Sequence, residues 1–355
     1  MLKAAAAGLL VLKVDQAITE YQDQMLTVIA GALGPSVQAG YAAVNTDGGH
    51  PFTDDLFKAA TDGSFGLASP GNVDWTALQN FASVALNDMV HLGKAITTSY
   101  YGKAPKYSYW NGCSTGGRQG MMQAQRFPKN FDGILAMAPA FNWGSLLPAG
   151  FWPLMAMKTE AYYPPPCEMI AIQKAAIEVC DELDGVKDGV VAAQGLCDFD
   201  ATSIVGQIFD CEGDSRRISQ EAAKVANSVW QGKRAHFLHF RDSTDRRRGP
   251  THPSRRGWYG LAHEAPMAMP PPRAGLAQTI CDENNKNCGP SAFPIAESWF
   301  KYYIRKDPDF DVNTMTPEQW WGYLHISRQW FDSIVGTDDP DLAEFSEFGG
   351  KMISW

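Results

Sequence analysis

The sequence predicts an α/β protein whose parallel sheet is interrupted by a large insertion. Residues 1–148 alternate apolar, strand-like runs with helical stretches, the pattern of a sheet with right-handed crossovers. Residues 149–347 break that pattern into proline-rich loops, cysteines and aromatic residues, and residues 348–355 read as a turn that enters another strand. We therefore expect a core domain over 1–148, an inserted domain over 149–347 and a returning core strand that begins near 348.

Four runs in the first segment carry this expectation. Gly40–Val44 and Tyr107–Trp110 have strand-like composition, and Gly133–Ala138 is an apolar run suited to a buried parallel strand. Leu78–Tyr100 has the apolar period of a helix. Ahead of them, the apolar stretch Ala4–Leu12 is flanked by lysines and is interpreted either as a weak signal peptide or as the start of an ordinary apolar helix.

The composition indicates a globular protein and excludes two kinds of partner. Of 355 residues, 45% are hydrophobic and 19% are charged, and 30 Lys and Arg against 39 Asp and Glu give a formal charge of −9. That acidic balance disfavours nucleic acid as the main partner. No apolar run approaches the ~18 residues that a membrane span needs, so we expect no membrane partner either.

One stretch, Lys233–Arg256, differs from the rest of the chain. It holds eight Lys or Arg, two Asp and three His within 24 residues, and it lacks an apolar period. Such a run is typical of a solvated, disordered loop and less often of an arm that binds nucleic acid. We expect an exposed, poorly ordered loop here.

Residues Gly112–Gly116 read G-C-S-T-G and match G-x-S-x-G, the pattern of a nucleophile elbow. A strand-like run precedes the motif and a helical run, Arg118–Phe127, follows it, which is the strand–turn–helix context that an elbow needs. The glycines leave room for a tight, strained turn at the serine. We expect Ser114 to be a nucleophile and the Thr115 N–H, at the helix N-terminus, to bind an oxyanion. A glycine-rich turn with a passive serine is the alternative.

A serine nucleophile needs a histidine base and an orienting carboxylate, and no downstream histidine is well placed for that role. Three of the five lie inside the basic stretch, and the other two lie in loop-rich or aromatic regions rather than at the end of a core strand. We expect each to be a surface residue or part of the insertion. The five are His236, His239, His252, His263 and His325.

A longer run around the elbow resembles a known family. Tyr107–Gly120, followed by Gln125–Pro128 and Phe131–Ala140, is similar to the tannase/feruloyl esterase family, in which a cysteine directly precedes the nucleophile. The resemblance implies an α/β-hydrolase fold with a large inserted lid domain and a secreted serine esterase for esters of aromatic acids. It implies feruloyl esters of plant cell-wall polysaccharide as the first substrate class and gallate esters as the second.

An acidic loop within Cys180–Val190 carries three aspartates in eight residues, with glycines that permit sharp turns. Such a loop can wrap a calcium ion or remain a solvated acidic turn, and the residues by themselves leave both open. The resemblance implies Ca²⁺, since the lid of that family binds the ion at this motif. The implied ligands are the side chains of Asp181, Asp184 and Asp188 and the carbonyls of Val186 and Val190.

Seven cysteines, six of them after residue 160, favour disulfides and an exported protein, and the spacing of a zinc site is absent. Cys167, Cys180, Cys197 and Cys211 surround the acidic loop. Pairing Cys167 with Cys180 and Cys197 with Cys211 would clamp both sides of it. Cys281 and Cys288 would close a small loop of their own.

The sequence also departs from the family. After a strand like Lys351–Trp355, the family continues into a segment with the catalytic aspartate and a His-Cys pair. The cysteine of that pair forms a disulfide with the cysteine that precedes the nucleophile. This chain contains no His-Cys pair, so we expect the C-terminal part of the hydrolase domain to be missing and Cys113 to be unpaired. We accordingly expect residues 1–355 alone to be inactive. The alternative function is a catalytically dead, calcium-binding relic of the fold.

Overall fold

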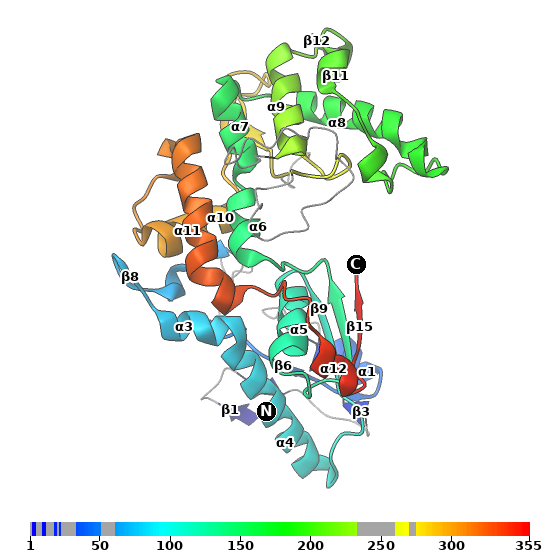
Figure 1. Cartoon of the computed structure of the whole chain (residues 1–355), viewed down its shortest axis with the longest axis vertical. Coiled ribbons are helices and arrows are strands. Elements are labelled where there is room, and N and C mark those ends of the chain that lie inside the picture. Colours follow the sequence, from blue (N-terminus) through cyan, green and yellow to red (C-terminus); the bar gives the residue numbers. More distant parts are fainter. Residues whose placement is uncertain are drawn as a thin grey trace. The chain divides into compact units, whose positions relative to one another are not determined.

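A computed structural model of the chain describes residues 2–4, 9–11, 18–19, 21–22, 33–50, 61–232, 260–269 and 275–355. The chain divides into two compact units, each built from segments that are separate in the sequence (Figure 1). The first unit comprises Met1–Leu147, Ser298–Phe310 and Leu324–Trp355, and the second comprises Pro148–Glu297 and Asp311–Tyr323. The basic stretch Lys233–Arg256, predicted to be an exposed loop, lies outside the described residues.

The first unit contains a parallel four-stranded sheet, as the alternation of apolar runs predicts. Its strands follow the order β15-β10-β9-β4, and β9 and β10 pair in register from Tyr109 with Gly133 to Cys113 with Met137. Trp110, on β9, is almost fully buried in the core of this unit. Because the strands are parallel, the carboxyl ends of β9 and β10 meet at one edge. The strands are β4 (Tyr21–Gln22), β9 (Tyr109–Cys113), β10 (Gly133–Met137) and β15 (Lys351–Ser354).

The N-terminal residues of this unit form strands rather than a helix. Leu2–Ala4 (β1) and Leu9–Val11 (β2) pair antiparallel, and β2 also pairs with Val44–Asn45 (β6). The interpretation of this stretch as the start of a helix is therefore wrong, because its residues pair across strands. The other short strands are β3 (Ile18–Thr19) parallel to β5 (Tyr41–Ala42), and β7 (Leu67–Ser69) antiparallel to β8 (Asn72–Val73).

A long helical run, interrupted by one π-helical turn, follows these strands. Asp74 caps its start by accepting a hydrogen bond from the Ala77 N–H at 2.9 Å, and Gly102, at φ 70°, ends it. The predicted helix Leu78–Tyr100 lies within this run. Its segments are α3 (Trp75–Gln79), the π-turn η3 (Asn80–Val84) and α4 (Ala85–Tyr101). The remaining helices of the sheet region are α1 (Leu33–Gln38) and α5 (Thr115–Arg126), which packs on β9 and β10 (Figure 1).

Aromatic side chains from distant segments form a second core region of the first unit. Trp299 stacks on Tyr303 with ring centroids 4.5 Å apart, and Phe331 meets Trp299 edge-on at 4.9 Å. Trp143 contacts Trp299, and Trp75 stacks on Phe331. Long-range packing of these rings assigns their segments to this unit. The helices that carry or flank them are α6 (Trp143–Ala149), α10 (Pro294–Trp299), η8 (Phe300–Arg305), α11 (Pro317–Val335) and α12 (Ala343–Glu347).

This packing divides the chain differently from the predicted insertion at 149–347. Residues 298–310 and 324–347 belong to the first unit, and only 311–323 of that C-terminal region stays with the second. The sequence pattern shows aromatic residues there but does not show which partners bury them.

The second unit is mainly helical. Its apolar core includes Met157, Ile172 and Val229, one from each of its three longest helices. None of the helices in the described residues is long and apolar enough to cross a membrane. Its elements are α7 (Trp152–Glu160), α8 (Pro166–Cys180), the 3₁₀ turn η4 (Asp181–Asp184), α9 (Gln220–Gln231), the hairpin β11 (Ile208–Cys211) and β12 (Asp214–Arg217), and the pair β13 (Thr279–Ile280) and β14 (Gly289–Pro290).

Three disulfides brace the second unit, and two of them differ from the predicted pairing. Cys167 bonds Cys211 and Cys180 bonds Cys197, with Cα–Cα distances of 5.4 and 5.3 Å. The predicted Cys167–Cys180 bridge is wrong because both residues lie on α8, in its first turn and at its last residue. Thirteen residues of helix span ~20 Å, whereas a disulfide needs Cα atoms within ~7 Å. The predicted Cys197–Cys211 bridge fails with it, and Cys281–Cys288 forms as predicted.

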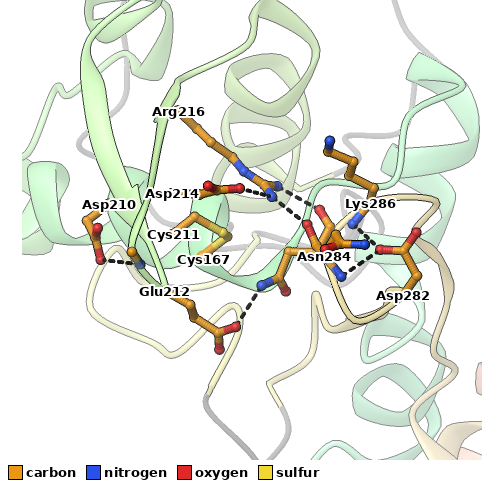
Figure 2. A network of polar contacts seen from close by, with 11 residues as sticks. Cys167, Asp210, Cys211, Glu212, Asp214, Arg216, Asp282, Asn284 and Lys286 are labelled. Atoms are coloured by element: carbon orange, nitrogen blue, oxygen red, sulfur yellow. Dashed lines mark hydrogen bonds and ion pairs between the residues drawn. A yellow bond between two sulfur atoms is a disulfide. The ribbon is translucent and has the colours of Figure 1, made fainter.

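The hairpin and the loop closed by Cys281–Cys288 are joined by polar contacts (Figure 2). Arg216 donates to the carbonyl oxygens of Asn284 and Asn285 at 2.5 and 2.7 Å, and the Asn285 amide donates to Glu212 at 2.8 Å. Asp282 holds the loop from inside, since it accepts the N–H groups of Asn284 and Lys286. The disulfide Cys167–Cys211 thus ties α8 to the hairpin, and Arg216 ties the hairpin to a second disulfide loop.

Candidate active site

The predicted elbow is a strand–turn–helix in the structure. β9 ends at Cys113, α5 begins at Thr115, and Ser114 between them has φ 60° and ψ −112°. A residue with a Cβ rarely adopts such a conformation, and backbone strain of this kind concentrates at functional sites. The strand begins two residues later than the predicted Tyr107–Trp110 and ends three residues later, so it carries the chain directly into the serine.

Backbone hydrogen bonds hold Ser114 against the loop that follows β10. Its N–H donates to the carbonyl of Met137 at 2.9 Å, and its carbonyl accepts the N–H of Ala140 at 2.9 Å. The same carbonyl accepts the N–H of Arg118 at 3.0 Å, which closes the first turn of α5. Ala138 (φ 36°) and Asn142 (φ 60°), within the loop after β10, also have left-handed backbone conformations. The elbow and this loop therefore form one hydrogen-bonded unit at the carboxyl edge of the sheet.

Two glycines of α5 permit this packing. A Cβ atom on Gly117 would lie 2.5 Å from the Met137 carbonyl oxygen and 2.7 Å from the Cα of Pro139. A Cβ atom on Gly120 would lie 2.8 Å from the Trp110 ring, whose Nε1–H donates to the Gly116 carbonyl at 2.9 Å. The helix can lie this close to β9 and to the loop after β10 only because these positions lack side chains.

Thr115 occupies the first position of α5. The N–H groups in the first turn of a helix have no partner within the helix, and the helix dipole places partial positive charge there. α5 runs from Thr115 to Arg126 without an acidic residue in its first turn. The N-terminus of α5 beside Ser114 is therefore a place where a developing negative charge can be stabilised.

The histidines of the described part of the first unit do not form a hydrogen bond with the Ser114 hydroxyl. His50 instead stacks on Phe65, with ring centroids 5.2 Å apart, while His91 lies within α4 and His325 within α11. His263 belongs to the second unit, and His236, His239 and His252 lie outside the described residues. We expected none of the downstream histidines to be the base that accepts the Ser114 proton, and this expectation stays a prediction.

Cys113, the residue before Ser114, is free and half-buried at the end of β9. The other six cysteines are all in disulfides.

The sequence of the chain matches a known protein family over most of its length. The family model described as tannase and feruloyl esterase matches residues 18–355. The chain belongs to this family. A probable feruloyl esterase of Arthroderma benhamiae is 36% identical over 91% of this chain and 55% of its own length. A tannase of Aspergillus oryzae is 27% identical over 95% of this chain and 60% of its own length.

The fold agrees with solved members of the tannase and feruloyl esterase family. Tannin acyl hydrolase from Aspergillus niger superposes with a TM-score of 0.77 at 27% identity, covering 96% of this chain and 59% of that structure. Feruloyl esterase B from Aspergillus oryzae has a TM-score of 0.69 at 22% identity, with the same coverage of 96% and 59%. The chain thus spans between 55% and 60% of the length of these relatives. The structural likeness is that of an α/β-hydrolase-type fold.

The acidic loop of this family member is organised by backbone hydrogen bonds to its aspartates. Asp181 is 5% exposed, and its carboxylate accepts the N–H groups of Asp188 and Gly189 at 3.0 to 3.1 Å. Asp184 accepts the Val186 N–H at 2.8 Å, and Asp188 accepts the Val190 N–H at 3.0 Å. Each aspartate therefore turns at least one oxygen toward the loop's own backbone.

The donors of this loop match calcium in kind but are not gathered around one point. Calcium prefers carboxylate and carbonyl oxygens, and the loop offers both. Within the described residues, however, no three His, Cys, Asp or Glu side chains are close enough to share a metal ion. The ion pair of Lys187 with Glu182, at 3.0 Å, is exposed and lies outside the predicted ligand set. Asp184 and Asp188 each accept these N–H groups through one carboxylate oxygen, so a second oxygen of each remains that could contact an ion.

Sequence reasoning missed Arg118, which is fully buried behind the elbow. It lies within the run that resembles the family, but an arginine on a helix is ordinarily exposed, so its type and position gave no indication of burial.

Proposed function

We propose that the protein is a serine carboxylic ester hydrolase in which Ser114 attacks the ester carbonyl. The observation that carries the proposal is the strained backbone of Ser114, at φ 60°, where β9 meets α5. Strain at that position exposes a serine hydroxyl beside a helix N-terminus, as acyl transfer requires. Membership of the tannase and feruloyl esterase family supports the same reaction.

In this proposal the chain's own residues bind and stabilise the reacting group. The Ser114 hydroxyl forms the new bond to the carbonyl carbon, and the carbonyl oxygen takes up the negative charge of the tetrahedral intermediate. The Thr115 N–H, at the start of α5, donates to that oxygen. A base must accept the serine proton, and no described histidine of the first unit is hydrogen bonded to Ser114. The reaction therefore depends on a base that the described residues do not identify.

We propose esters of aromatic acids as substrates, either free or linked to polysaccharide. Feruloyl esters of plant cell-wall material rank first, because the relative with 36% identity is named a probable feruloyl esterase. Gallate esters rank second, because the relative with 27% identity is named a tannase. Neither nucleic acid nor a membrane is a proposed partner.

Secretion is part of the same proposal. Three disulfides in a unit of modest size favour an oxidising compartment, where such bonds form and persist.

We also propose that the acidic loop binds Ca²⁺ as a structural ion. The carboxylates of Asp181, Asp184 and Asp188 and the carbonyls of Val186 and Val190 would hold it. The ion would supply charge neutralisation and rigidity to a loop already closed by the Cys180–Cys197 disulfide, and it would take no part in ester cleavage.

A second candidate function is a fold without turnover. It is favoured by the missing hydrogen bond between Ser114 and any described histidine of its unit. Hydrolysis assays with methyl ferulate, methyl gallate and an aliphatic methyl ester discriminate the two. Absence of turnover on all three esters supports the inert protein.

The matched variants are Ser114→Ala and Thr115→Ala. If the esterase proposal holds, Ser114→Ala lowers kcat by ~10⁴-fold or more, as loss of a serine nucleophile does. Thr115→Ala keeps the backbone N–H and should retain activity within a few-fold. Hydrolysis that persists in Ser114→Ala would overturn the assignment of the nucleophile.

A further inference from the structure

We propose that Arg118 is a positioning residue whose guanidinium ties the start of α5 to the π-turn η3 and thereby holds Ser114 in its strained conformation. Its effect on catalysis rests on the function proposed above. Its effect on the local stability of the elbow does not depend on that function, so the effect on catalysis and the effect on stability are measured separately.

The guanidinium of Arg118 is enclosed by backbone carbonyls and aromatic rings. Arg118 is 0% exposed, and its Nη1 and Nη2 donate to the carbonyl oxygens of Ala82 and Phe81 at 3.2 and 3.3 Å. The guanidinium carbon lies 5.0 Å from the Phe81 ring centroid and 5.6 Å from that of Trp143. Burying a charge is costly unless hydrogen bonds compensate it, so the side chain is held to this position by the groups that surround it.

The two carbonyls that Arg118 contacts lie within the π-turn η3. The Ala85 N–H donates to the carbonyl of Asn80, five residues back instead of the usual four. The extra residue in such a turn interrupts the regular ladder of hydrogen bonds, and π-turns occur often at functional sites. The planar guanidinium presents several N–H donors in a fixed arrangement that can reach both carbonyls.

The same π-turn also binds the loop that follows β6. The Asn80 amide donates to the Gly49 carbonyl at 3.1 Å, and a Cβ atom on Gly49 would lie 2.7 Å from the Asn80 carbonyl carbon. The His50 ring packs on Phe81 at 5.9 Å. η3 therefore connects the loop after β6, the nucleophile helix and Trp143, which follows the loop after β10.

Arg118 transmits this anchoring to the nucleophile through its own backbone. Its N–H donates to the Ser114 carbonyl at 3.0 Å, while its side chain is fixed on η3. Lysine presents its N–H donors from one nitrogen and lacks the planar group that lies beside the Phe81 and Trp143 rings, so it is not a conservative replacement at this site. Arg118→Lys therefore keeps the charge and weakens the anchor.

Arg126, on the same helix, provides a matched control. Its Nη2 donates to the carbonyl oxygens of Ser333 and Ile334 at 2.6 and 3.1 Å, so it too joins α5 to the backbone of another segment. It lies eight residues after Arg118, ~12 Å further along the helix. Replacing it removes the same kind of contact without loosening the elbow.

Hydrogen exchange on the 355-residue chain tests the anchor directly. In Arg118→Lys and Arg118→Met, the amides of residues 118–121 should exchange at least ~10-fold faster than in the unmodified protein, while the end of α5 keeps its protection. In Arg126→Met the first turn should keep its protection. Unchanged exchange in both Arg118 variants, or an equal loss in Arg126→Met, would overturn the proposal. If Arg118→Met does not fold, the exchange rates of Arg118→Lys are sufficient for this test.

Steady-state kinetics then tests the catalytic consequence in protein that hydrolyses esters through Ser114. At a temperature where circular dichroism shows every variant folded, Arg118→Lys should lower kcat at least ~10-fold with KM changed less than ~3-fold, as expected when only the reacting group is misplaced. Arg126→Met should keep its kcat. A kcat for Arg118→Lys within threefold of wild type contradicts the positioning role. If Ser114→Ala keeps the activity, the proposed esterase function fails. If the 355-residue chain has no activity, the second candidate function is supported instead. In both cases the exchange experiment still decides about Arg118.

Discussion

Gly117 faces the carbonyl oxygen of Met137 so closely that a Cβ atom on the glycine would lie 2.5 Å from it. Real Cβ atoms are not found this near an oxygen, and the opposing atom belongs to the backbone, so it cannot rotate away. Ser114, three residues earlier, is hydrogen bonded to the same Met137 carbonyl at 2.9 Å. A side chain at position 117 would therefore displace the backbone to which Ser114 is hydrogen bonded.

Gly117→Ala should destabilise the protein by ~1–3 kcal/mol, the usual cost of forcing an atom into a filled site. Gly322→Ala is its control, because that glycine lies in α11 with nothing within 4 Å of the added atom. The control should be neutral or stabilising by up to ~1 kcal/mol, since alanine favours helix. Urea unfolding of both variants measures the difference. Equal effects of the two substitutions would contradict the close packing of α5 on the loop after β10.

Calcium should raise the melting temperature of the second unit. The carboxylates of Asp181, Asp184 and Asp188 lie within one short loop and repel one another, and an ion that binds only the folded state stabilises it by mass action. Calorimetric titration and thermal unfolding with Ca²⁺, Mg²⁺ or a chelator measure the effect, and Ca²⁺ should exceed Mg²⁺, which demands tighter octahedral geometry. Asp184→Ala should abolish the response.

The control for that experiment is Glu182→Gln, which removes a charge from the same loop outside the proposed ligand set. Glu182 pairs with Lys187 at the surface, and the pair is exposed, so its loss should alter stability little. The response to calcium should persist in this variant. If protein with its disulfides formed shows no heat of Ca²⁺ binding, the proposed calcium site is contradicted and the loop is a solvated acidic turn.

Peptide mapping without reduction should recover Cys167 linked to Cys211 and Cys180 linked to Cys197. Cys180→Ser should lower stability by ~3 kcal/mol, because that bridge closes a loop of 17 residues. Cys281→Ser should cost less, since its bridge spans a separation of 7 and Arg216 also holds that loop. A recovered peptide linking Cys167 to Cys180 would contradict the helix α8.

Acidification should weaken the second unit through His263. Burial lowers the pKa of this imidazole, and the nearby Glu264 carboxylate only partly opposes that effect. The ring packs on Trp230 with centroids 4.8 Å apart. Below the ordinary pKa of about 6.5, the unfolded chain takes up a proton that the folded protein does not, so stability falls as pH decreases from that value toward the lowered pKa.

Urea unfolding between pH 7.5 and pH 5 measures this dependence. The glutamine of His263→Gln cannot take up the proton. In this variant, the decrease in the free energy of unfolding that begins near pH 6.5 should therefore be absent. An identical pH dependence in the variant and the unmodified protein would show that His263 does not titrate differently on folding.

Local sequence was sufficient for the elbow. The G-x-S-x-G pattern, the strand before it and the helix after it are set by neighbouring residues, and the structure places Ser114 between β9 and α5 as predicted. The apolar run at Gly133–Ala138 likewise became β10, since a continuous apolar segment of that length fits a strand buried on both faces. The number and spacing of the cysteines also indicated that six of them form disulfides.

Other features depended on contacts between residues far apart in the chain. The disulfide partners were mispredicted because helix α8 separates Cys167 from Cys180, and only the folded unit shows which cysteines approach. The division into units follows Trp299 and Phe331, whose rings pack on each other and on distant tryptophans.

By itself, the sequence determined the position of the strand–turn–helix at Ser114, the α/β alternation and the resemblance to one family, because each is carried by residues adjacent in the chain. Only the tertiary structure decided that Arg118 is buried on the carbonyls of Phe81 and Ala82. Those carbonyls are presented by a π-turn some 36 residues away, and no local pattern encodes which backbone groups a distant side chain will meet once the core has closed.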